Sequence, residues 1–217
     1  MPAGRFWSST IGKKVVMAVT GIVLVGYILA HVTANLLIFA GAAAIDAYAA
    51  KLRTLPMLLW GGRILLLVSV VLHVVAATQL AIGARAARPT PYHRFEPQTS
   101  SAASRTMRWG GVALLLFLIY HILHFTTGQA HPDFIHLAPY HNVTTAFRVW
   151  WVAAIYIAAM FALAMHLYHG TWSMFQTLGI EHPRVNPARR RLATAIAVLV
   201  PLGFVTVPIA VLIGVIR

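Results

Sequence analysis

Long apolar runs alternate with polar connectors along the whole chain. The runs cover residues 14–40, 57–84, 109–127, 146–178 and 192–216. Each is close to or longer than the roughly 20 residues that a helix needs to cross the hydrocarbon core of a bilayer. Because lipid offers no hydrogen-bond partners, a lone spanning segment must satisfy its backbone as a helix. The pattern therefore predicts an all-α integral membrane bundle of five transmembrane helices, which forms a single domain over residues 1–217.

The first and last runs carry additional signals. Lys13 and Lys14 precede the first run and no small-residue cleavage site follows it, so we expect this run to remain as the first span. Several runs are longer than a bilayer requires, and we expect those helices to tilt or to project beyond the hydrocarbon. Pro201 and Pro208 should kink the last helix, since proline removes a helical hydrogen bond.

Composition and charge support a membrane protein with a defined orientation. The chain is 59% hydrophobic and 10% charged, and its net charge is +13. The basic residues lie in the connectors, which indicates topology signals rather than nucleic-acid binding. With the N-terminus inside, twelve Lys and Arg fall on the inner side and five on the outer side. This imbalance predicts a cytoplasmic N-terminus.

The inner connector, residues 85–108, contains Pro89, Pro91 and Pro97, and is either a docking segment for a soluble partner or a plain topogenic loop.

Histidines occur inside the first four runs, and the fifth run has none. They are His31; His73; His121 and His124; His166 and His169. An unpartnered imidazole in hydrocarbon costs on the order of a few kcal/mol. A single one is more often a structural hydrogen-bonding group, but four spans that each supply one indicate ligand binding. The chain has no cysteine, which excludes disulfides, thiolate metal sites and iron–sulfur clusters held by this chain.

The depths of these histidines fall into two layers. Counted from the outer ends of the runs, at about 1.5 Å per residue, His121 lies about 10 Å deep and His31 about 15 Å deep. His73 and His166 lie at about 25 and 27 Å by the same count. The layers pair His31 with His121 on the outer side and His73 with His166 on the inner side. This is the arrangement that two six-coordinate hemes require, with each iron held between two imidazoles.

A bare metal site is the alternative use of these residues. His121 with His124, and His166 with His169, are i,i+3 pairs that could chelate zinc or copper. Such a site normally also uses carboxylates or cysteines. The acids lie outside the runs, at Asp46, Glu96, Asp133 and Glu181. A histidine-based metal transporter, and a heme-free anchor whose histidines line quinone sites, therefore stay open at this point.

The residues around the candidate ligands are compatible with heme. Small residues that would admit a flat macrocycle lie near them, although such residues are common in any contact between membrane helices: Gly26, Ala30, Ala34, Ala76, Ala77 and Gly170. Cations that could pair with propionates lie at both surfaces: Arg85 and Arg108 inside, Arg63 and Arg148 outside. The outer connector carries three histidines that we expect to be solvated: His131, His136 and His141.

Several phrases of the sequence resemble one family. They are "SSTIGKKVVMAVTG" (residues 8–21), "HVTANLLIFAG" (31–41), "AIDAYAAKLRTLP" (44–56), "IYHILHFTTG" (119–128) and "MHLYHGTWSMFQTLGI" (165–180). Together they resemble the five-helix diheme cytochrome b subunit of succinate dehydrogenase, the b558 type, which is related to quinol:fumarate reductase anchors. The resemblance covers nearly the whole chain in order and length.

The resemblance implies specific heme ligands. One histidine from each of the first four helices would bind iron: His31, His73, His121 and His166. Two heme b groups would be held, the outer by His31 with His121 and the inner by His73 with His166. The choice of His121 and His166 within their pairs rests on the resemblance. His124 and His169 would then be quinone-site, supporting or packing residues.

The resemblance also implies a function and partners. The chain would be the membrane anchor and electron-transfer subunit of a succinate:menaquinone oxidoreductase, or of a quinol:fumarate reductase, in the respiratory chain and tricarboxylic acid cycle. It would lie in the cell membrane beside a flavoprotein and an iron–sulfur subunit, and it would have no catalytic residue for succinate itself. Asp46 is the only outer acid near the first two spans that could serve a quinone site. An anchor for another dehydrogenase, such as a hydrogenase or formate dehydrogenase, is the alternative within electron transfer.

Overall fold

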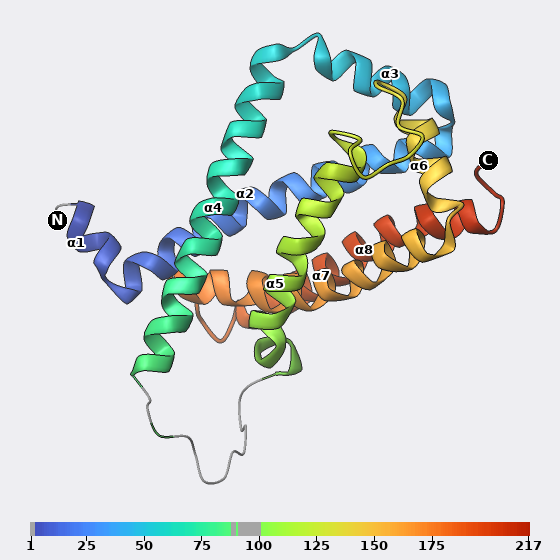
Figure 1. Cartoon of the computed structure of the whole chain (residues 1–217). Coiled ribbons are helices and arrows are strands. Elements are labelled where there is room, and N and C mark those ends of the chain that lie inside the picture. The colour runs from blue at the N-terminus through green and yellow to red at the C-terminus, as the bar shows by residue number, and fades with distance from the viewer. Residues whose placement is uncertain (1–2, 88–89, 91–100) are drawn as a thin grey trace.

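Helices account for most of the described part of the chain. The computed structural model describes residues 3–87, 90 and 101–217 (Figure 1). Most of the inner connector, including Arg88, Arg94 and its three prolines, therefore lies outside the described residues. The elements are α1 (Ala3–Ser8), α2 (Thr10–Asn35), the 3-10 helix η1 (Leu36–Ala40), α3 (Ala42–Arg53), α4 (Pro56–Ala86), α5 (Ala102–Phe125), α6 (Pro139–Phe147), α7 (Trp150–Thr177) and α8 (Asn186–Leu212).

Five helical segments in the described residues are long and apolar enough to cross a membrane. They are Thr10–Ala40, which joins α2 and η1, then Pro56–Ala86, Ala102–Phe125, Trp150–Thr177 and Asn186–Leu212. The predicted all-α fold with five spans is thus confirmed. Pro201 and Pro208 lie inside α8 without ending it. The predicted kink there stays a prediction.

Capping explains why two helices begin before their apolar runs. The Ser9 hydroxyl accepts a hydrogen bond from the Gly12 backbone N–H at 2.9 Å, so α2 begins at Thr10 rather than at residue 14. Ser101 caps α5 in the same way, through the Ser104 N–H at 3.2 Å, and adds a polar first turn ahead of residue 109. A serine cap satisfies backbone donors that hydropathy does not detect.

Two short helices cover one end of the bundle. The chain turns from η1 into α3 at Gly41, whose φ of +93° lies in the region that favours glycine. Helices α3 and α6 pack against each other at this end (Figure 1). The Asp46 carboxylate on α3 accepts a hydrogen bond from the Tyr140 N–H in the first turn of α6, at 3.0 Å. Asp46, the candidate acid for an outer quinone, therefore contributes a hydrogen bond between these two helices.

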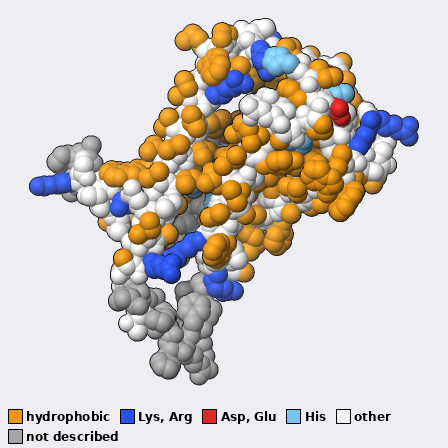
Figure 2. Space-filling view, in the orientation of Figure 1, with side chains coloured by type: hydrophobic (Ala, Val, Ile, Leu, Met, Phe, Trp, Pro, Cys, Tyr) orange, Lys and Arg blue, Asp and Glu red, His pale blue; other side chains and the backbone are white. Residues whose placement is uncertain are grey.

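Helix α7 is the centre of the bundle. It packs against α8, α5 and α2, and α4 packs mainly against α2. The buried core between α2, α7 and α8 includes Val32, Leu163, Leu167, Ala197 and Val200. Large apolar side chains remain exposed along the spans, and Figure 2 shows them covering the visible face. Such a surface is unfavourable in water and suits contact with lipid.

Candidate functional site

Two histidines from different helices face each other in the half of the bundle nearer α3 and α6. The rings of His31 on α2 and His121 on α5 have centroids 5.9 Å apart, and their planes are nearly perpendicular at 82°. Aromatic rings surround this pair: Phe204 lies 5.6 Å from His31, and Tyr156 lies 5.9 Å from His121. The chain therefore brings together the first of the two predicted pairs.

A second pair forms between α4 and α7. The ring centroids of His73 and His166 are 6.2 Å apart, with an angle of 53° between the ring planes. The chain thus brings together the four histidines that the depth argument paired, and in the same two combinations.

The spacing of each pair fits a metal ion between the two rings. With metal–nitrogen bonds of about 2 Å, two imidazoles that bind one ion from opposite sides have ring centroids about 6 Å apart. The Nδ1 atoms of His121 and His166 are also buried without a hydrogen-bond partner among the described residues. Neither ring is therefore held by a hydrogen bond at Nδ1 within the described residues, which disfavours a purely structural hydrogen-bonding role for these two histidines.

Within the described residues, the helices that carry each histidine pair do not pack closely against each other, which leaves room for a cofactor between them. Helices α2 and α5 are not among the pairs that pack closely in the described part of the chain, and neither are α4 and α7. Facing imidazoles, rather than packed backbones, link the two helices in each case. This is the arrangement expected where a macrocycle lies between helices and takes one axial ligand from each, so the residues fit heme.

The neighbouring histidine on α5 has a different environment. His124 is 2% exposed, and its Nδ1 lies 2.9 Å from the Tyr156 hydroxyl. Its ring stacks on that of His131 at 4.9 Å. His121, and not His124, has a ring contact with His31. His169 is half-buried on α7, three residues after His166.

The expectation that the connector histidines are solvated is wrong for His131. This side chain is 5% exposed, and its Nε2 donates to the Asn142 carbonyl at 2.8 Å. Within the connector, the Asn142 side chain also bonds both the N–H and the carbonyl of Ile135, each at 2.8 Å. His136 is exposed, as expected, and lies 3.0 Å from Arg53 Nη1, while His141 is partly exposed.

Sequence reasoning treated one buried arginine only as a topology signal. Arg189, in the first turn of α8, is 5% exposed, and its guanidinium lies 4.5 Å from the Trp172 ring of α7. Its Nη1 donates to the Ile180 carbonyl and to Asn186. Arg190 stacks on the same indole at 4.7 Å. The run of three arginines at 189–191 could have drawn attention to this segment. Which of them contacts Trp172, however, depends on how α7 and α8 pack.

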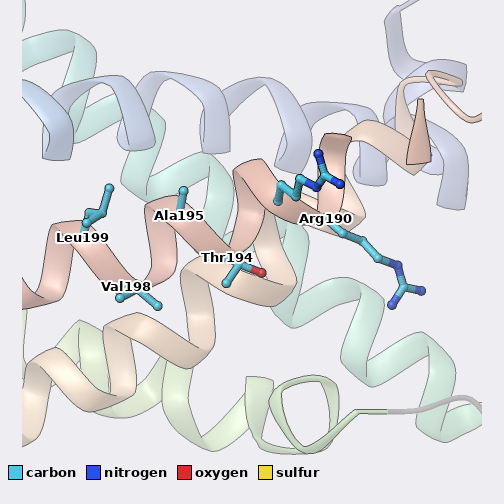
Figure 3. A pocket seen from close by; sticks show the side chains of 6 residues that line it. Arg190, Thr194, Ala195, Val198 and Leu199 are labelled. Carbon is cyan, nitrogen blue, oxygen red and sulfur yellow. The ribbon is translucent and has the colours of Figure 1, made fainter. Parts of the chain in front are cut away.

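A groove on α8 lies outside the histidine site. It has a volume of about 510 Å³, and no histidine lines it (Figure 3). The residues that line it lie on the exposed face of α8 and recur at every fourth position in two neighbouring rows: Arg190, Arg191, Thr194, Ala195, Val198 and Leu199. Most of this face is apolar, as expected of a helix that contacts lipid.

A bare metal site finds no support in the geometry. Over the residues that the structure describes, no three His, Cys, Asp or Glu side chains gather closely enough to hold a metal ion. The i,i+3 pairs on α5 and α7 therefore lack a third ligand of these types within the described chain.

Comparison with known proteins identifies the family. No curated protein and no solved structure significantly matches the chain. The family of succinate dehydrogenase/fumarate reductase transmembrane subunits matches residues 84–206, which is more than half of the chain. This segment contains His121 and His166, while His31 and His73 precede it. The five apolar helices agree with a multi-pass membrane subunit. The chain belongs to the succinate dehydrogenase/fumarate reductase transmembrane subunit family.

Proposed function

We propose that this chain is the diheme b anchor and electron-transfer subunit of a succinate:menaquinone oxidoreductase, or of a quinol:fumarate reductase, in the cell membrane. The observation that carries the proposal is the meeting of four imidazoles from four spans in two pairs, with ring centroids 5.9 and 6.2 Å apart. His31 with His121 would hold the outer heme, and His73 with His166 would hold the inner heme.

When bound, the two hemes would carry electrons one at a time between an iron–sulfur partner and a quinone. The chain's own residues hold and shield these groups. Each of the four histidines would hold a heme through one ring nitrogen, and its helix fixes the position of that nitrogen along the bundle. Around the outer pair, Phe117, Tyr156 and Phe204 exclude water from the imidazoles. A dry environment around a redox centre is one of the means by which a protein sets its potential.

Family membership implies that the chain associates with the flavoprotein and iron–sulfur subunits of the complex. The flavoprotein would oxidise succinate, and this chain would only conduct electrons and anchor the assembly. Purification through a tag on this chain tests the partnership. We expect a flavoprotein with succinate dehydrogenase activity and an iron–sulfur protein to co-purify. Recovery of hydrogenase or formate dehydrogenase subunits instead would contradict it.

Heme content tests the ligand assignment. We expect the purified complex to show a pyridine hemochrome spectrum with two heme b per chain. Single alanine variants of the four proposed ligands should lose one or both hemes, because neither pair can hold iron from both sides with one imidazole. His136→Ala is the matched control, since this histidine is exposed outside the spans, and it should keep both.

Alanine variants of the remaining membrane histidines, His124 and His169, provide a further control for the heme-content test. We expect His124→Ala and His169→Ala to keep both hemes, because neither ring takes part in a facing pair across helices. A complex without heme would overturn the proposal. Loss of heme in His124→Ala with retention in His121→Ala would overturn the assignment on α5.

A further inference from the structure

His73 is the one proposed ligand whose ring is tied to two acceptors on another helix. Its Nδ1 lies 3.1 Å from the Met17 carbonyl oxygen and 3.1 Å from the Thr20 hydroxyl oxygen. Both acceptors belong to α2, whereas His73 belongs to α4. Thr20 is 7% exposed, so water does not compete strongly for this contact.

The hydrogen bonds of Thr20 determine the direction of its contact with His73. The Thr20 hydroxyl donates its single proton along α2, to the Val16 carbonyl at 2.8 Å. Its oxygen is then left as an acceptor for the imidazole. The Met17 carbonyl can only accept. Both partners therefore require that His73 Nδ1 carries the proton.

This protonation state leaves Nε2 of His73 with the lone pair that a metal ligand needs. Hydrogen bonding at the far ring nitrogen is the usual way in which a protein orients a ligating histidine and raises its basicity. The opposite ligand, His166, lacks such support, because its Nδ1 is buried without a partner among the described residues. The inner pair is therefore asymmetric, with one imidazole fixed from α2.

The surface of α2 beside His73 leaves room for the ring at Gly21. A β-carbon placed on Gly21 would lie 3.7 Å from His73 Cε1, which is ordinary van der Waals contact. Met17 and Thr20 thus contact the ring at Nδ1, while Gly21 leaves the space beside Cε1 open. These contacts come from α2, a helix that carries no ligand of the inner pair.

We propose that Thr20 is a positioning residue for the inner heme, which acts by holding His73 as an Nδ1–H donor and so makes its Nε2 a stronger electron donor to iron. This inference rests on the proposed function. A stronger donor stabilises the oxidised iron, so the hydrogen bond lowers the reduction potential of the inner heme. Removal of the hydroxyl leaves the Met17 carbonyl as the remaining acceptor and so weakens the hydrogen bonding at Nδ1. It should therefore raise that potential and leave the outer heme unchanged.

The test compares Thr20→Val with Thr20→Ser in the purified complex. Valine keeps the shape of threonine but not its hydroxyl, while serine keeps the hydroxyl. Thr106→Val is the matched control, because Thr106 makes the same bond to the carbonyl four residues earlier, at 2.9 Å to Ala102, on the exposed face of α5. Heme content is measured by pyridine hemochrome, and the two midpoints by redox titration of the visible bands.

We expect Thr20→Val to keep two hemes and to shift one midpoint upward, with a changed low-spin EPR signal for that heme. Thr20→Ser and Thr106→Val should match the wild type. Loss of one heme in Thr20→Val alone, with rescue by serine, would also support positioning. Two unshifted midpoints in Thr20→Val, or the same change in Thr106→Val, would overturn the inference while the proposed function stands. A wild-type complex without heme would overturn both.

Discussion

An imidazole inside a membrane helix has two ring nitrogens that need partners, and the two histidines of α5 differ in how these nitrogens are paired. His124 directs Nδ1 to the Tyr156 hydroxyl, whereas His121 faces His31 and leaves Nδ1 without a partner among the described residues. Their depths differ by only about 4.5 Å, three residues along the helix. Depth alone could therefore identify the layer but not which of the two histidines faces His31, because that depends on the rotation of the helix.

Tyr156→Phe tests the structural role of His124. The change removes the 2.9 Å hydrogen bond and leaves a buried imidazole nitrogen without its partner. We expect it to destabilise the protein by about 1–2 kcal/mol, seen as a lower thermal unfolding midpoint in detergent. Both hemes should remain, because the aromatic ring beside His121 is preserved. Tyr48→Phe, at a tyrosine that is 44% exposed, is the control. Loss of one heme in Tyr156→Phe would contradict this assignment of roles.

At the scale of helices, hydropathy predicted all five spans because a bilayer sets the length of an apolar helix. It did not predict α3 and α6, which are short and partly polar, and whose packing depends on contacts between residues far apart in sequence, such as Asp46 with Tyr140. The same limit applies to Arg189 and Trp172, which meet only when α7 and α8 pack. Hydropathy predicts the spans, whereas the rotation of each helix relative to its neighbours depends on packing.

Gly203 tests the packing of α8 against α2. A β-carbon there would lie 2.7 Å from Val32 Cγ2, a methyl on a stiff β-branched side chain. We expect Gly203→Ala to lower the free energy of unfolding by about 1–3 kcal/mol through overpacking. Gly26→Ala is the control, since a β-carbon on Gly26 meets nothing within 4 Å. Equal thermal unfolding midpoints for the two variants would show that α2 and α8 do not pack this closely.

At the scale of the whole molecule, the exposed apolar surface and the distribution of Lys and Arg indicate how the chain lies in the membrane. Apolar side chains face outward along the spans, and the sequence places twelve of its Lys and Arg on one side against five on the other. An odd number of spans places the termini on opposite sides. The imbalance supports a cytoplasmic N-terminus, and hence a C-terminus on the outer face.

Reporter fusions after Arg217 test this orientation. We expect alkaline phosphatase fused there to be active, because it folds outside the cytoplasm, and a green fluorescent protein fused there to be dark. Fusions within the fourth connector, after Arg184, should behave in the opposite way. A fluorescent C-terminal fusion together with an inactive phosphatase would reverse the proposed orientation, and with it the assignment of the inner and outer pairs.

The most direct test of the diheme account is an experimental density map of the complete complex. The account predicts two flat porphyrin densities, one with iron between His31 and His121 and the other with iron between His73 and His166. A map with no porphyrin in this subunit, or with the irons held by other side chains, would contradict it.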